Sequence, residues 1–134
     1  MFVEIFSLCD AATSENGKLN ILGAFDTIWV RKFPTVYPHC TAAVRVRFSA
    51  IENGAHPVEV RFINADGRNV LPPAGGSIQV ACTSEHRSVS TNLILNVQSL
   101  NLQAPGEFSL ELSIDGVNML SLPLFIRSMP QAGG

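Results

Sequence analysis

The sequence is poor in charged residues and has no cluster of basic ones. Charged residues make up 15% of the 134-residue chain, against roughly 25% in typical soluble domains. The formal net charge is −2 at pH 7. Apart from the adjacent Arg31 and Lys32, basic residues stand singly, as Lys18 does, or alternate along one stretch, as Arg45 and Arg47 do. Because nucleic-acid-binding surfaces are clustered and basic, we expect no nucleic-acid partner.

The chain also lacks a long apolar run and a disulfide pattern. No apolar run reaches the roughly 18 residues that a membrane-spanning helix needs. The opening MFVEIFSLCD contains Glu4 and has no basic segment, unlike a signal peptide. Cys9, Cys40 and Cys82 are odd in number and far apart, which is not typical of a disulfide scaffold. These absences predict a cytoplasmic protein with reduced cysteines and no membrane contact.

The sequence shows no helical periodicity either. Its apolar residues instead alternate with polar ones. Apolar residues recur at every second position in five stretches, a pattern typical of half-buried strands. Turn signals such as Asn16-Gly17 and Asp115-Gly116 separate such stretches. The pattern predicts an all-β fold, an antiparallel two-sheet β-sandwich, immunoglobulin-like or alternatively a jelly roll. We expect one domain over residues 1–130 and a disordered tail over residues 131–134. The alternating stretches are residues 43–49, 58–63, 78–82, 93–97 and 107–114.

Several local pairings can be proposed from the alternation. Residues 43–49 and 58–63 are predicted to form a hairpin with Val46 opposite Val60. In the hairpin around Asp115-Gly116, the apolar phase changes after Met119, which predicts a bulge near that residue. Pro123 lacks an N–H and therefore indicates a strand edge or an irregular ladder.

Two polar or glycine-rich segments are predicted to lie outside the strands. Residues 10–18 form a loop between strands at 2–8 and 19–30, with Glu15 and Asn16 exposed at its tip. The PPAGGS stretch at residues 72–77 is interpreted as a flexible connection, because it has neither a Walker lysine nor a following helix.

Few residues are candidates for chemistry. Cys9, His39 and Cys40, joined by Cys82 or His86, could form a metal site. However, no C-x₂-C or H-x₃-H spacing is present, and adjacent strand residues point to opposite faces. Ser84-Glu85-His86 and Ser128 lie in no G-x-S-x-G elbow. We therefore predict no catalytic residue, no metal ligand and no cofactor.

An aromatic stretch at residues 29–38 is the clearest candidate for binding. It holds the only Trp and the only Tyr of the chain. Trp29, Phe33 and Tyr37 are predicted to form a partner-binding surface, because Trp, Tyr and Arg concentrate at interface hot spots. Alternatively, Trp29 caps the core while Pro34 and Pro38 carry the chain from one sheet to the other.

Three stretches together span most of the chain: CDAATSENGKLNILGAFDTIWV, FPTVYPHCTAAVRVRF and PGEFSLELSIDGVNMLSLPLFI. Through them the chain resembles a bacterial family of small β-rich proteins catalogued only as a domain of unknown function. It implies a cytoplasmic, single-domain bacterial sandwich. No activity or functional residue transfers with it.

The sequence favours a non-catalytic binding or assembly module over an enzyme. We expect it to self-associate, as a homo-oligomer or with a protein partner, through an exposed strand edge or the surface at residues 29–37. One alternative is a small hydrolase or metal-dependent enzyme with a site at one end of the sandwich. Another is a carbohydrate-binding module, an interpretation that rests on fold analogy and for which one Trp and one Tyr offer few stacking platforms.

Overall fold

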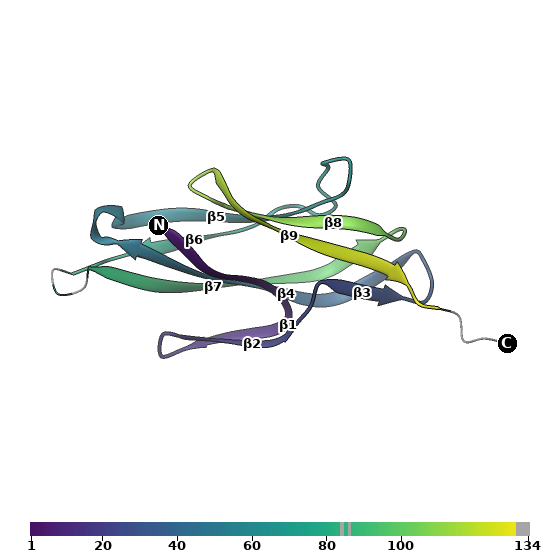
Figure 1. Ribbon diagram of the computed structural model, residues 1–134, viewed down its shortest axis with the longest axis horizontal. Coiled ribbons are helices and arrows are strands. Elements are labelled where there is room, and N and C mark those ends of the chain that lie inside the picture. Colours follow the sequence, from purple (N-terminus) through teal and green to yellow (C-terminus); the bar gives the residue numbers. More distant parts are fainter. Residues whose placement is uncertain (84, 86, 131–134) are drawn as a thin grey trace.

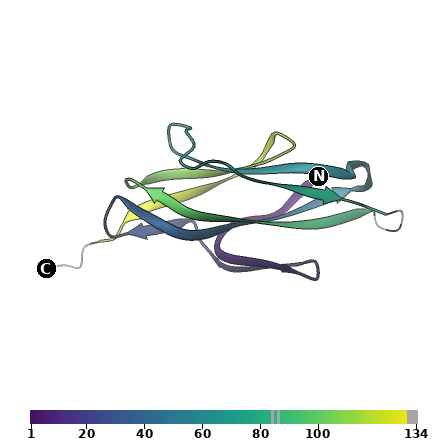
Figure 2. The same ribbon diagram turned by 180° about the vertical axis from the view of Figure 1, so that it is seen from behind.

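The protein consists of two β-sheets that face each other (Figures 1 and 2). The structure, a computed structural model, describes residues 1–83, 85 and 87–130. One sheet has the strand order β2-β1-β4-β7 and the other the order β3-β9-β8-β5-β6. The elements are β1 (Phe2–Glu15), β2 (Lys18–Ala24), β3 (Thr27–Val30), β4 (Thr35–Ser49), η1 (Ala50–Glu52), β5 (Gly54–Ile63), β6 (Ala74–Val80), β7 (Ser88–Leu102), β8 (Gly106–Ile114) and β9 (Val117–Ser128).

The predicted all-β, two-sheet sandwich is confirmed. Every strand pair is antiparallel except β3 with β9, which run parallel. In the described part of the chain, the only helical element is the short 3₁₀ turn η1, and no helix could span a membrane. The tail predicted at residues 131–134 lies outside the described residues.

The core forms where the alternation places apolar side chains on the inner faces of both sheets. Val44, Val46 and Phe48 of β4 are fully buried, as are Leu110 and Leu112 of β8. Burying a side chain of this size contributes about 1.5–3 kcal/mol. The intervening residues of β4 point to the outer face. This burial of every second residue between Val44 and Phe48 is what the sequence pattern predicts, whereas residues 40–44 of β4 are all buried.

The predicted hairpin of residues 43–49 with 58–63 is wrong. The strand β4 pairs with β1 and β7, whereas β5 pairs with β6 and β8 in the opposite sheet. Val46 and Val60 both belong to the core, but they enter it from different sheets. Alternation reports which face of a strand is buried, and it cannot tell a hydrogen-bonded neighbour from a strand across the core. The η1 turn carries the chain from one sheet to the other.

The predicted loop at residues 10–18 is also wrong. The strand β1 continues to Glu15, and β2 begins at Lys18. Only Asn16 and Gly17 form the turn, with φ values of 52° and 75° that suit a type I′ hairpin. Glu15 and Asn16 are exposed at this tip, as predicted. The hairpin projects along the outer side of the β4–β7 layer (Figures 1 and 2), where Arg45 Nη1 donates to the Gly17 carbonyl at 3.0 Å.

Two further segments differ from their predicted bounds. The strand expected at residues 19–30 is divided by Phe25 and Asp26 into β2 and β3, which lie in different sheets. In the PPAGGS stretch, the strand β6 already begins at Ala74, and its glycines pair with Val58 and Glu59 of β5. The glycine-rich composition suggests a flexible connection, but pairing with β5 holds these glycines in an extended strand.

The irregularities predicted in the last hairpin are confirmed. The β8–β9 register shifts so that Leu112 pairs with Leu120 and Ser113 with Asn118, which leaves Met119 in a bulge. The strand β3 pairs only with residues 125–128 of β9. At Pro123, β9 therefore has β8 on one side and no described strand on the other.

We predict that Gly23→Ala destabilises the protein by about 1–2 kcal/mol, because Gly23 has a φ of +68° that is costly for other residues. An added Cβ would also lie 2.4 Å from Asp10 Oδ2. Gly75→Ala is the matched control, since a Cβ there meets only the Val58 carbonyl oxygen at 3.5 Å. Urea denaturation measures both. Equal destabilisation by the two variants would contradict the assignment of strain to Gly23.

We predict that the free energy of unfolding decreases as pH rises, because His56 loses its proton. Its Nε2 lies 2.5 Å from the Glu52 carbonyl oxygen and its Nδ1 lies 2.7 Å from Asp115 Oδ2, and both oxygens only accept. These two bonds, that to Glu52 first, raise the pKa of His56 above its ordinary value of 6.5. The stabilisation is therefore complete below pH 6.5 and is lost as pH rises through the folded-state pKa.

Denaturation of the wild type and His56→Gln at a series of pH values measures this effect. The difference in unfolding free energy between the two should shrink as pH rises. A difference that is independent of pH would show that His56 does not gain its proton preferentially in the folded state.

Candidate binding surface

The structure separates the three residues predicted to bind a partner. Trp29 on β3 is 55% exposed, so it does not cap the core. Phe33 and Tyr37 are only partly exposed, and both pack against the hydrophobic core. The Tyr37 ring lies 6.1 Å from the ring of Phe25, centroid to centroid. Pro34 lies in the connection from β3 to β4, where the chain crosses between the sheets. Of the three predicted residues, Trp29 is the one that presents most of its side chain to solvent.

Strand pairing gathers other side chains around Trp29. Trp29 is paired with Arg127 in the parallel β3–β9 ladder, and Phe125 is paired with Glu107 in the β8–β9 ladder. Paired residues share a face of the sheet, and the intervening Ile126 is buried. These four side chains therefore lie on the outer face. Together with Pro105 they border a hollow of about 680 Å³. We call Trp29, Pro105, Glu107, Phe125 and Arg127 the Trp29 patch.

The patch combines an aromatic surface with two opposite charges. The guanidinium carbon of Arg127 lies 5.0 Å from the centroid of the Phe125 ring, a cation–π arrangement. Among the described residues, neither Arg127 nor Glu107 takes part in an ion pair. An exposed indole thus lies beside one cation and one anion that are both available to a partner.

Sequence reasoning missed Phe125, Arg127 and Glu107. A signal for two of them is present in the alternation of LPLFIRS, where Leu124 and Ile126 are buried while Phe125 and Arg127 face outward. What brings them beside Trp29 is the pairing of strands about a hundred residues apart in sequence. No local pattern reports such a pairing.

Of the residues considered for a metal or a nucleophile, Cys9 and Cys40 lie near each other, but the set does not come together as a site. Cys40 faces the core and His39 is exposed, as alternation predicts. In the described part of the chain, no three His, Cys, Asp or Glu side chains form a group suited to a metal ion. Ser84 and His86 lie outside that part.

The two buried thiols are poorly suited to chemistry. Burial, and secondarily the neighbouring Cys9, raises the pKa of Cys40 to about 11. Burial also raises the pKa of Cys9, whose thiol donates to the Thr41 carbonyl oxygen at 3.4 Å. Because the thiolate is the nucleophile and the metal ligand, both side chains are held in their unreactive form at neutral pH.

A carboxylate on the outer face of β8 is held ionised by neutral donors. Glu111 accepts hydrogen bonds from Ser121, from Asn118 at 2.7 Å and from Ser109 at 3.1 Å. These bonds, that of Ser121 first, lower the pKa of Glu111. A carboxyl group stabilised in its charged form is a poor proton donor, so Glu111 orders the outer face and does not suit acid catalysis.

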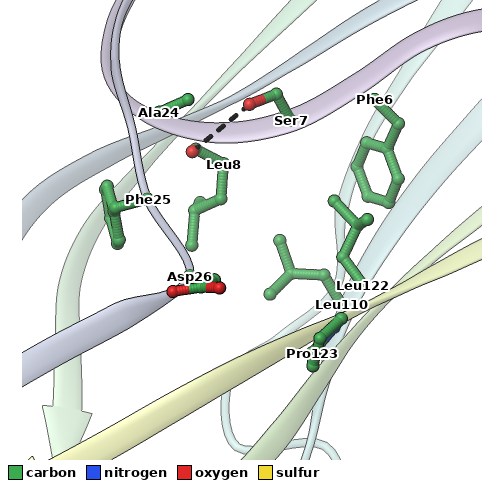
Figure 3. Close-up of a pocket in the computed structure, with 9 residues that line it drawn as sticks. All are labelled: Phe6, Ser7, Leu8, Ala24, Phe25, Asp26, Leu110, Leu122 and Pro123. Atoms are coloured by element: carbon green, nitrogen blue, oxygen red, sulfur yellow. Dashed lines mark hydrogen bonds between the residues drawn. The ribbon is translucent and has the colours of Figure 1, made fainter.

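A second hollow lies between the sheets at the side where β1 and β9 approach each other (Figure 3). Its volume is about 460 Å³. Its lining is apolar except for Ser7 and the Asp26 carboxylate. The apolar lining residues are Phe6, Leu8, Ala24, Phe25, Leu110, Leu122 and Pro123.

Comparison with known proteins identifies a family without an assigned function. Residues 4–127 match a family described as "Family of unknown function (DUF6941)". The chain belongs to this family. Its membership confirms the resemblance that the sequence motifs indicate. No curated protein matches the DUF6941 chain.

One of the solved structures that match the DUF6941 fold is only distantly similar to it. It is the Pseudomonas fluorescens alkylpurine DNA glycosylase AlkC bound to DNA containing an abasic site analog, with a TM-score of 0.49 and 8% identity. The similarity covers 94% of this chain and 30% of the glycosylase chain. A likeness this distant carries no argument about function.

We predict that Cys82 reacts with a thiol-specific disulfide reagent before Cys9 and Cys40 do. Cys82 is partly exposed, whereas the other two are buried. In native buffer, reaction should therefore show one fast thiol, and Cys82→Ser should abolish the fast phase. A fast reaction at Cys40 in the folded protein would contradict its assigned burial and raised pKa.

Proposed function

We propose that this protein is a non-catalytic binding module that self-associates through the Trp29 patch. The observation that carries the proposal is the exposed indole of Trp29 beside two opposite charges without ion-pair partners. Indole and guanidinium groups are enriched among the residues that dominate interface energies. A large aromatic side chain on a rigid strand loses little conformational entropy when a partner covers it.

The charges of the patch make it complementary to itself. A two-fold interface places the same patch on both subunits. With the axis near Phe125, which is paired with Glu107 and lies two residues from Arg127 on β9, Arg127 of one copy faces the partner's Glu107, and the same contact is repeated on the other side. The two indoles then lie on either side of the axis, where the partner subunit covers each of them, as in interfaces with a desolvated hot spot.

The position of Arg127 favours a protein partner over a sugar. Its guanidinium lies over the Phe125 ring and so occupies a face on which a sugar ring would stack. Trp29 is then the one aromatic platform of the patch with a large free surface. The carbohydrate-binding alternative therefore gains no support from the second aromatic residue.

The expected result is a concentration-dependent dimer that depends on the patch. Light scattering coupled to size exclusion should show a dimer for the wild type and a monomer for Trp29→Ala. Ile51→Ala is the matched control, because Ile51 is 95% exposed and lies on η1, outside the patch. Circular dichroism should show that all variants remain folded.

Charge exchange across the interface tests the geometry. Arg127→Glu and Glu107→Arg should each weaken the dimer, since each places like charges opposite one another. The double variant should restore association. A wild type that is monomeric at high concentration, or single and double charge variants that associate equally, would overturn the proposal.

A further inference from the structure

One long side of the sandwich is closed and the other is partly open. On the closed side, β6 lies over β7, so that a Cβ at Gly76 would contact Leu93 and Leu95 at 3.4 and 3.7 Å. On the other side, residues 2–7 of β1 and 117–123 of β9 each have a neighbouring strand on one side alone within the described residues. The 460 Å³ hollow lies between these two edges (Figure 3).

The open side leaves apolar residues of the inner face uncovered. Leu120 is paired with the buried Leu112, and Val117 is paired with the buried Ile114. Paired residues point to the same face, so Leu120 and Val117 belong to the core side of their sheet. They are nevertheless 41% and 58% exposed. The sheet on the other side of the core does not cover them.

The backbone of β9 is also incompletely paired at this place. The strand β3 covers residues 125–128 and then the chain turns away at Asp26, whose carbonyl oxygen accepts from the Phe125 N–H at 2.7 Å. Among the described residues, no strand continues the line of β3 beside residues 117–123 of β9. An exposed edge of this kind is a template for an added strand. The stretch VNMLSLP has no charged residue, and its bulge at Met119 and its Pro123 limit the ladder to the residues around them.

We call the unpaired edge of β9 at residues 117–123, together with the hollow beside it, the slot, and one charged residue lies at its end. Asp26 is the only charged residue among those that line the hollow. Its carboxylate accepts one hydrogen bond from the Thr27 hydroxyl at 2.8 Å. Within the described residues, no cation forms an ion pair with it. A basic side chain would complement this charge.

We propose that the open side binds an extended segment of a partner protein, which adds to the free edge of β9 as a strand. Every second residue of the segment is apolar and enters the hollow beside Leu120 and Leu122. A lysine or arginine at one end of the segment pairs with Asp26. This site is separate from the Trp29 patch, which lies on the outer face of the same sheet.

The probe is a synthetic peptide of about seven residues, the length of a typical strand. Valine and threonine alternate in it, and a lysine stands first in one version and last in another. Amide hydrogen exchange followed by NMR should show at least one version slowing exchange in residues 117–122. The uncharged edge of β7 is an internal control and should not change. Using Trp29→Ala as the host keeps the result independent of self-association.

Charge exchange then tests the role of Asp26. A third peptide carries glutamate in place of the lysine. Asp26→Lys should weaken binding of the lysine peptide roughly two- to fivefold and strengthen binding of the glutamate peptide by a similar factor, as for an exposed ion pair. Peptides methylated on alternate backbone nitrogens should lose binding, because they cannot form the ladder.

Four results would overturn the proposal. The first is that neither lysine peptide protects β9, and the second is that protection appears along β7 instead, which would indicate unspecific edge pairing. Protection of residues 117–122 that grows with protein concentration in the absence of peptide would assign the slot to a second copy. Equal binding of lysine and glutamate peptides would remove Asp26 from the site.

Discussion

The parallel pairing of β3 with the end of β9 determines both proposed surfaces. This contact joins four residues of each strand, and backbone hydrogen bonds flank it from Phe125 N to the Asp26 carbonyl oxygen and from Met129 N to the Val30 carbonyl oxygen. It places Trp29 beside Arg127 on the outer face. Because it covers only part of β9, it also leaves the slot beside residues 117–123. A longer β3 would close the sandwich and would remove the slot.

The arrangement separates two kinds of recognition on one sheet. The outer face at the β3 end presents rigid side chains, an exposed indole and two opposite charges around one hollow. The open side presents unpaired backbone together with an apolar hollow. A surface of complementary side chains suits binding of a folded partner, whereas an unpaired strand edge suits binding of an extended segment. The protein is therefore equipped, on our account, to assemble with itself and to hold a second chain.

Much of the fold can be predicted from the sequence, because burial of one face follows from alternation. The strands at residues 43–49, 58–63 and 107–114 lie within β4, β5 and β8, and the bulge at Met119 follows from a change of apolar phase. Which strands pair does not follow in the same way. The alternation around Val46 and Val60 is the same whether the two residues are neighbours in one sheet or face each other across the core. The sequence pattern extends the turn at Asn16-Gly17 into a longer loop, because the polar residues of β1 lie in an outer hairpin where alternation is weak.

The candidate site is harder to predict than the fold. Trp29 is noticeable because it is the only Trp, but Phe33 and Tyr37 are close to it only in sequence, and their side chains turn to the core. The residues that surround Trp29 in space come from the far end of the chain. The parallel pairing of the four-residue strand β3 with β9 has no recognisable pattern in the sequence of either strand.

The single Trp also allows the most direct test of the central claim, since all indole fluorescence comes from Trp29. We predict that its emission shifts to shorter wavelength as protein concentration rises through the monomer–dimer transition, because the partner subunit removes the indole from water. An emission spectrum that stays typical of exposed indole while light scattering reports a dimer would place the interface elsewhere and would contradict the account.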